Sequence, residues 1–143
     1  MFARAIGSVL SAGKITDTIV HSMAVVLTGL PAALLGVGML VANTLINVVL
    51  TSGSGQAVAT MPIMAPLADI IGITRQTAVM ACQFGDGLTN ILYPVSGYFI
   101  ATIGLAKVPY EKWVKFFMPL LLIEWAMTIV FMVIAQAIQW GPF

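Results

Sequence analysis

Long apolar runs interrupted by short polar segments dominate the chain. Residues 1–30 are predicted to form an N-terminal stub followed by an amphipathic arm. In the arm, residues 15–30, apolar positions recur at helical spacing and Asp17 and His21 occupy the polar side. The stub is too short to cross a bilayer. We therefore expect the arm to lie along a membrane interface or against a neighbouring helix.

Residues 31–71 are predicted to form a helical hairpin whose second helix covers 57–71. Asn43 and Asn47 lie four residues apart in its first, uncharged part and therefore share one helix face. Amide groups need polar partners in hydrocarbon, so that face should point inward. The polar segment between the two helices comprises Ser52, Gly53, Ser54, Gly55 and Gln56.

Residues 75–106 are predicted to form a discontinuous helix. It follows a short turn, 72–75, in which Thr74 is suited to cap the next helix. The apolar pattern is interrupted at 85–90, and the polar residues there and just beyond are Gly85, Asp86, Gly87, Thr89, Asn90 and Ser96.

The remaining sequence predicts a polar, aromatic loop at 107–115 and a final transmembrane helix at 114–138, with its apolar part at 116–137. The loop contains three lysines against one glutamate, whereas the 69–75 turn is balanced. The positive-inside rule therefore predicts that 107–115 is cytoplasmic.

Composition supports a membrane location for the whole chain. Of its 143 residues, 60% are hydrophobic and only 8% are charged, and the mean hydropathy is +1.05. So little charge cannot solvate a globular surface of this size, so we expect one multi-pass domain, 1–143, surrounded by lipid. A net charge of +1 gives no attraction to nucleic acid. Cys82 is the only cysteine and is expected to be a buried, inert thiol.

The two interruptions carry the candidate chemistry. Non-helical backbone at membrane depth is stable only where protein or a water-filled cavity surrounds it. Carriers use such breaks, in which half-helix N-termini face anionic groups and free carbonyls hold cations. We therefore predict that the polar residues of both breaks bind substrate and ion. Two other interpretations stay open: 52–56 is an ordinary turn outside the membrane, or Asp86 caps the following half-helix or lies in a surface loop.

Other polar residues point less strongly to function. Glu124, inside the last apolar run, is either a proton or cation site or the partner of an interfacial residue. Asp69, Arg75 and His21 are expected at the interface. The sequence contains no nucleophile–base arrangement, phosphate-binding loop or metal-spaced cluster, so it predicts no enzyme, no cofactor and no resident metal.

Several segments resemble the YfcC-like branch of the C4-dicarboxylate anaerobic carrier family, of the DcuC type. The resemblance covers nearly the whole chain, and the residues that carry it are GKITDTI at 13–19, SGSGQAVATMPIMAPLAD at 52–69, TRQTA at 74–78, QFGDGLTN at 83–90, PVSG at 94–97 and LAKVPYEKW at 105–113.

The resemblance implies an all-α ion-transporter-type fold of two inverted repeats, each with a re-entrant hairpin and a discontinuous helix. This chain would be the second repeat, with 31–71 as the hairpin and both breaks meeting near the membrane midplane. Family members are several times longer, so we expect a C-terminal portion that needs its N-terminal half or a homo-oligomer.

The predicted function is therefore that of the C-terminal part of a secondary transporter in the inner membrane. It would be an antiporter or an ion-coupled symporter for organic anions or amino acids, of the C4-dicarboxylate or the basic amino acid (arginine–ornithine) type. Na⁺ or H⁺ would be the coupling ion. The alternative is a membrane fragment or structural subunit that transports nothing.

Overall fold

The computed structural model describes the backbone of residues 15–48 and 50–141 and the side chains of 21–48 and 50–141. Within these ranges all regular secondary structure is helical, as the sequence predicts. The elements are α2 (Ile15–Thr28), η1 (Ala32–Leu34), α3 (Leu35–Asn47), α4 (Gly53–Ile71), α5 (Arg75–Gly87), α6 (Gly97–Leu105) and α7 (Tyr110–Ala137). The predicted stub and the side chains of Thr16 and Asp17 lie outside the described residues.

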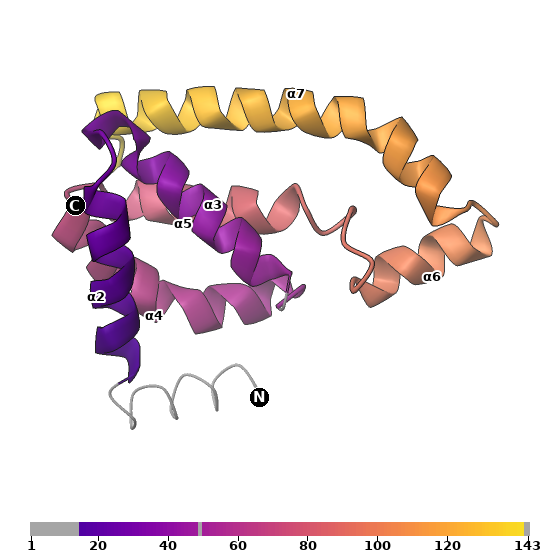
Figure 1. Cartoon of the computed structure of the whole chain (residues 1–143), viewed down its shortest axis with the longest axis horizontal. Helices are drawn as coiled ribbons and strands as arrows, with labels where there is room; N and C mark the ends of the chain where they lie inside the picture. The colour runs from indigo at the N-terminus through magenta and orange to yellow at the C-terminus, as the bar shows by residue number, and fades with distance from the viewer. Residues whose placement is uncertain (1–14, 49, 142–143) are drawn as a thin grey trace.

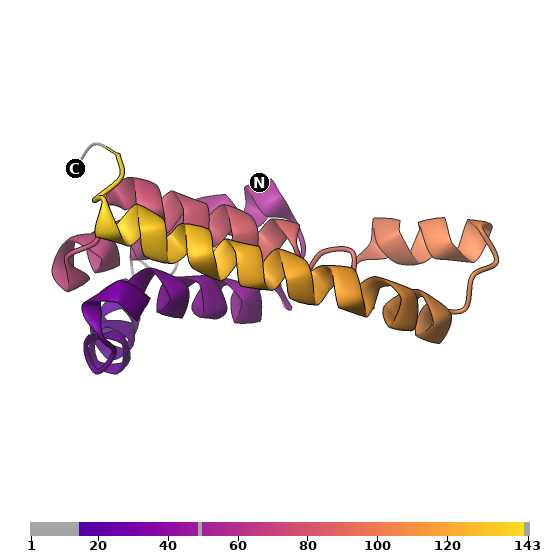
Figure 2. The ribbon, with the colours of Figure 1, turned by 90° about the horizontal axis from the view of Figure 1, so that it is seen from above.

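The helices form a packed cluster at one end of the molecule. At the other end, α6 and the first part of α7 form a narrow extension (Figures 1 and 2). In the cluster, α5 packs against both α3 and α4, and α2 packs against α4. Helix α7 runs the length of the molecule, and α6 accompanies only its first part (Figure 1). The residues between α5 and α6 connect the cluster to this extension.

Helices α3 and α4 form the two legs of the hairpin. Helix α3 has 13 residues, or about 20 Å of helix, which is shorter than the ~30 Å hydrocarbon core. The prediction that the second leg begins at 57 is wrong, because α4 begins at Gly53. Ser52 has an extended backbone, and its side chain accepts a hydrogen bond from the Gly55 N–H at 3.4 Å. This N-cap starts the helix four residues before the predicted position.

A tight turn joins α4 to α5. Gly72 ends α4 in the left-handed conformation, with φ 76°, which glycine adopts without steric cost. Thr74 then caps α5 by accepting a hydrogen bond from the Thr77 N–H at 3.2 Å. The predicted capping role of Thr74 is confirmed.

Residues 88–96, between α5 and α6, are not helical. The predicted break began at 85, but Gly85, Asp86 and Gly87 form the last turn of α5. This boundary is wrong by three residues, because backbone hydrogen bonds continue from Leu88 N to Phe84 O and from Asn90 N to Asp86 O. Pro94 lies further on and prevents the helix from running through the segment.

Helix α7 begins earlier than the sequence predicts. Pro109 is its N-cap and Glu111 lies in its first turn, where a negative charge is favourable, so 110–115 is helix rather than loop. Among the described helices, α7 is the one long and apolar enough to cross a membrane. Its 28 residues give about 42 Å of helix, so its first turns would reach a headgroup layer.

The core lies where α3, α4 and α5 meet. Met39, Leu40, Met64 and Leu67 are fully buried there. Ala78 and Ala81 on α5 are also buried, and their small side chains allow close helix approach. By contrast α7 keeps many apolar side chains exposed, which suits contact with lipid or with further helices.

Candidate functional site

The last turn of α5 and the first turn of α4 meet at Asp86. This carboxylate is only 8% exposed. Asn90 Nδ2 donates to its Oδ1 at 2.8 Å. Its Oδ2 lies against Gly53, so closely that a Cβ added at position 53 would stand 2.6 Å away. The structure thus brings together one residue of each predicted break.

Asn47, at the end of α3, joins the hairpin to the discontinuous helix. Its Nδ2 lies 3.2 Å from the Asp86 carbonyl oxygen, 2.8 Å from Thr89 Oγ1 and 3.2 Å from Asn90 Oδ1. Thr89 in turn donates to the Gly85 carbonyl oxygen at 2.7 Å. The break after α5 is therefore bonded to the hairpin by a side chain that is fully buried.

Gln56 and Asn43 form a second contact between the hairpin legs. Gln56 is fully buried, and its Nε2 donates to the Asn43 carbonyl oxygen at 3.0 Å. Gly85 of α5 packs against the same part of α3, because a Cβ there would lie 2.9 Å from Asn43 Cβ and 3.0 Å from Thr44 N. The backbones of α3 and α5 approach closely at this point.

The remaining predicted site residues are placed differently. Ser52 and Ser54 are exposed at the hairpin tip, where Gly55 is partly buried. Gly87 faces open space. Ser96 is buried at the N-cap of α6, and its Oγ has no hydrogen-bond partner in the described part of the chain. Asp86 lies in α5, so the interpretation that it caps the following half-helix is wrong.

Three aromatic residues hold the break between α5 and α6. Tyr110 Oη donates to the Leu92 carbonyl oxygen at 2.7 Å, and Trp113 Nε1 donates to that of Ile91 at 3.0 Å. Tyr93 Oη donates to the Thr44 carbonyl oxygen at 3.1 Å. These bonds give non-helical backbone the partners it needs inside a protein or a membrane. The sequence predicts only a polar, aromatic loop at 107–115 and does not indicate these hydrogen bonds.

The electrostatics of the site follow from one buried charge and two helix ends. Among the described residues no basic group forms an ion pair with Asp86. The N-terminus of α4 contributes roughly half a positive charge, and the C-terminus of α5 roughly half a negative charge. These contributions offset each other, so the site retains about the one negative charge of the carboxylate. It is suited to a cationic group or an inorganic cation.

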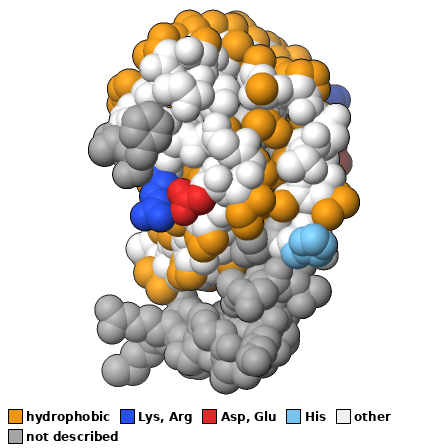
Figure 3. Space-filling view, turned by 90° about the vertical axis from the view of Figure 1, so that its left-hand side faces the viewer, with side chains coloured by type: hydrophobic (Ala, Val, Ile, Leu, Met, Phe, Trp, Pro, Cys, Tyr) orange, Lys and Arg blue, Asp and Glu red, His pale blue; other side chains and the backbone are white. Residues whose placement is uncertain are grey.

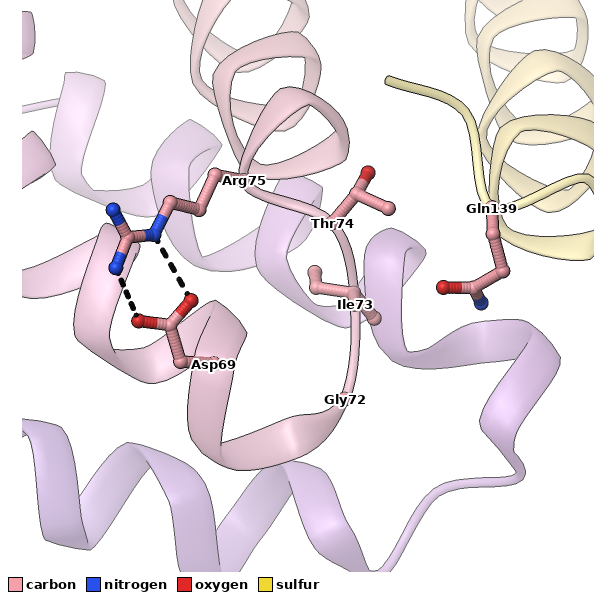
Figure 4. A pocket seen from close by; sticks show the side chains of 6 residues that line it. All are labelled: Asp69, Gly72, Ile73, Thr74, Arg75 and Gln139. Carbon is pink, nitrogen blue, oxygen red and sulfur yellow. Dashed lines mark hydrogen bonds and ion pairs between the residues drawn. The ribbon is translucent and has the colours of Figure 1, made fainter. Parts of the chain in front are cut away.

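Asp69 and Arg75 form a separate, exposed pair at the α4–α5 turn. Arg75 donates to both carboxylate oxygens, at 3.0 and 2.8 Å (Figure 4). These hydrogen bonds hold the pKa of Asp69 below its ordinary value. At this end of the molecule, a basic and an acidic side chain lie in contact among apolar and neutral ones (Figure 3). This ion pair links the two sides of the α4–α5 turn. Asp86 lies at the opposite end of α5 and takes no part in it.

The turn also borders a pocket of about 280 Å³, which Gln139 lines from the far side (Figure 4). Elsewhere, Glu124 is half-buried on α7 and His21 is exposed on α2. Within the described ranges no three His, Cys, Asp or Glu side chains are grouped to hold a metal ion. Asp86 is therefore the titratable residue around which the polar contacts gather.

Polar residues at helix ends within an apolar, helical chain are typical of membrane carriers. Comparison with known proteins gives the particular family. Residues 1–137 match the DcuC family, described as C4-dicarboxylate anaerobic carrier. The chain belongs to this family, as the sequence resemblance predicts, and it is a membrane protein.

Two curated relatives match the chain over part of their length. The first is "Putative basic amino acid antiporter YfcC" of Escherichia coli (strain K12), 43% identical over 102 residues, which are 71% of this chain and 20% of that protein. The second is an "Uncharacterized protein" of Haemophilus influenzae (strain ATCC 51907 / DSM 11121 / KW20 / Rd). It is 40% identical over 119 residues, which are 83% of this chain and 23% of that protein. The chain thus spans about a fifth of their length. No solved structure matches it.

Proposed function

We propose that the chain is the C-terminal part of a secondary active transporter for organic anions or amino acids. The observation that carries the proposal is the meeting of the α4 N-terminus and the α5 C-terminus around the buried carboxylate of Asp86. Burying a carboxylate without a basic partner is costly unless a cation is bound or a proton is taken up. In an ion-coupled carrier, such a carboxylate would bind the coupling ion.

The proposed substrate class draws on the site and on the relatives. The name of the Escherichia coli relative supports a basic amino acid, and the family description supports a C4-dicarboxylate. Both kinds of molecule carry carboxylate groups, for which the hydroxyls of Ser52 and Ser54 and the backbone N–H groups beside them are suitable donors. Asp86 would then hold either the coupling ion or the cationic group of the substrate.

We further propose that 31–71 is re-entrant and that both breaks lie at membrane depth. The short span of α3 supports this arrangement, because about 20 Å of helix would end inside the hydrocarbon core. Residues 107–115 would face the cytoplasm, and the membrane would be the inner membrane. The other half of the carrier would come from the N-terminal part of the family protein or from a second copy.

Transport in proteoliposomes tests the proposal. We would reconstitute the chain together with the N-terminal part of its family protein. Counterflow of labelled arginine, ornithine and succinate would then be measured for the wild type, Asp86→Asn and the control Asp69→Asn. We expect Asp86→Asn to reduce transport at least about tenfold, because removing one partner of a charged contact typically costs 2–5 kcal/mol. Asp69→Asn should transport normally.

Equal transport by Asp86→Asn and the wild type would contradict the assignment of Asp86. If the wild type transports no substrate of the panel, the result would favour the second candidate, a membrane subunit that transports nothing.

A further inference from the structure

In the described part of the chain, three buried side-chain oxygens on α3 and α4, the helices that contact Asp86, have no hydrogen-bond partner. They are Asn43 Oδ1 and Asn47 Oδ1 on α3 and Gln56 Oε1 on α4. All three side chains are fully buried. Buried amide oxygens without a donor are rare in native structures, because each costs roughly 1–3 kcal/mol. Three in one small region need an explanation.

The orientation of these amides is fixed by their nitrogen atoms. Asn43 Nδ2 donates to the Met39 carbonyl oxygen at 2.9 Å, and Gln56 Nε2 donates to that of Asn43 at 3.0 Å. Asn47 Nδ2 lies 3.2 Å from the Asp86 carbonyl oxygen. A backbone carbonyl only accepts hydrogen bonds, so rotating any of these amides by 180° would place two oxygens against each other. The oxygens therefore remain without donors.

The three amides and Asp86 belong to one contiguous cluster. Gln56 bonds the backbone of Asn43, and Asn47 bonds the backbone of Asp86. Gly85, which precedes Asp86, packs on Asn43, and Gly53, one turn before Gln56, packs on Asp86. The cluster thus combines one buried carboxylate with neutral oxygen acceptors. Oxygen-only ligand sets of this kind suit hard cations.

We propose that this cluster binds a monovalent inorganic cation, Na⁺, through Asp86 and the side-chain oxygens of Asn43, Asn47 and Gln56. The inference rests on the proposed function, in which the ion would be the coupling ion. A single net negative charge matches a monovalent ion better than a divalent one. A proton on Asp86 would supply one donor and leave at least two of the three amide oxygens unpaired.

Equilibrium binding of ²²Na⁺ to the full 143-residue chain in lipid nanodiscs tests this inference. N-methyl-D-glucamine chloride would keep the ionic strength constant. We expect saturable binding to the wild type and none to Asp86→Asn. Binding at least tenfold weaker is expected for Asn43→Leu and Gln56→Leu, which remove the oxygens but keep the side-chain volume.

The matched control is Gln136→Leu. Gln136 Oε1, near the end of α7, is likewise buried without a partner among the described residues, but Gln136 lies outside the cluster. This variant should bind ²²Na⁺ as the wild type does. The second measurement is the unfolding temperature of the wild type, which should rise with Na⁺ and not with N-methyl-D-glucamine, because a bound ion stabilises the folded state.

Unsaturable binding to the wild type, or unchanged affinity in Gln56→Leu, would overturn the inference and indicate that water alone fills these positions. The outcome is separable from that of the transport assay. Transport without Na⁺ binding would overturn the ion site and keep the carrier. Na⁺ binding without transport by the reconstituted carrier would keep the site and overturn the proposed function.

Discussion

Gly53 and Asp86, 33 positions apart in the sequence, are in direct contact. A Cβ at residue 53 would lie 2.6 Å from Asp86 Oδ2. Real Cβ atoms do not approach oxygen so closely, so position 53 needs glycine for this arrangement. The contact also places the carboxylate at the N-terminus of α4.

Gly53→Ala should therefore impair the site without weakening α4, because alanine is the better helix former. The added methyl group must displace the Asp86 carboxylate. We expect transport and ²²Na⁺ affinity each to fall at least about tenfold, as misplacing a binding group by about 1 Å can cost 10²-fold. The control is Gly104→Ala on α6, where no atom of the described residues lies within 4 Å of the added Cβ. Normal function in Gly53→Ala would show that the carboxylate is free to move.

Gly85→Ala should destabilise the packing of α3 on α5. The new methyl group would meet Asn43 Cβ at 2.9 Å and the Thr44 backbone nitrogen at 3.0 Å. Overpacking of this kind typically costs about 1–3 kcal/mol. Thermal unfolding in detergent, followed by circular dichroism, measures the effect. Gly87→Ala, two residues later in open space, should be neutral or stabilising; equal unfolding temperatures for the two variants would contradict the close approach.

Asn47→Leu should separate the hairpin from the break after α5. It removes a donor that reaches Asp86, Thr89 and Asn90 together. Leaving buried acceptors unpaired costs roughly 1–3 kcal/mol, so the unfolding temperature should fall. Leu45→Ala on the exposed side of α3 is the control and should change it less. A smaller loss in Asn47→Leu than in Leu45→Ala would argue against the bridging role.

Trp113→Phe should loosen residues 88–96. Phenylalanine preserves the stacking on Phe117, whose ring centroid lies 5.7 Å from that of Trp113, but cannot donate to the Ile91 carbonyl oxygen. Hydrogen–deuterium exchange in nanodiscs should become faster in this segment and stay unchanged in α4. Trp140→Phe serves as the control. Equal protection of 88–96 in both variants would mean that the indole bond does not hold the break.

The sequence predicted those features that depend on local chemistry. Thr74 next to a new apolar run predicted a helix cap, and glycine-rich polar segments inside apolar runs predicted the two interruptions. It also predicted that Asn43 and Asn47 share an inward face, because four residues make about one helical turn. Family membership followed from long motifs around the same segments.

The sequence did not predict features that depend on contacts between distant segments. One local feature was also missed: Ser52 caps α4, so the helix starts at Gly53, although glycines at 53 and 55 suggested a break. Tyr110 and Trp113 look like headgroup residues in the sequence, yet they bond the backbone of the break some 20 residues earlier. Which acceptors Asn47 reaches depends on how α3 packs on α5, and no spacing rule specifies that.

Cysteine accessibility tests most directly whether both breaks lie inside the membrane. In a Cys82→Ala background, single cysteines at 54 and 88 would be labelled with a membrane-impermeant maleimide from each side of sealed vesicles. Cysteines replacing Arg75 and Lys107 are the aqueous references, expected on opposite sides. We predict that 54 and 88 react many times more slowly than both references. Reaction of both break positions as fast as the references would contradict the account.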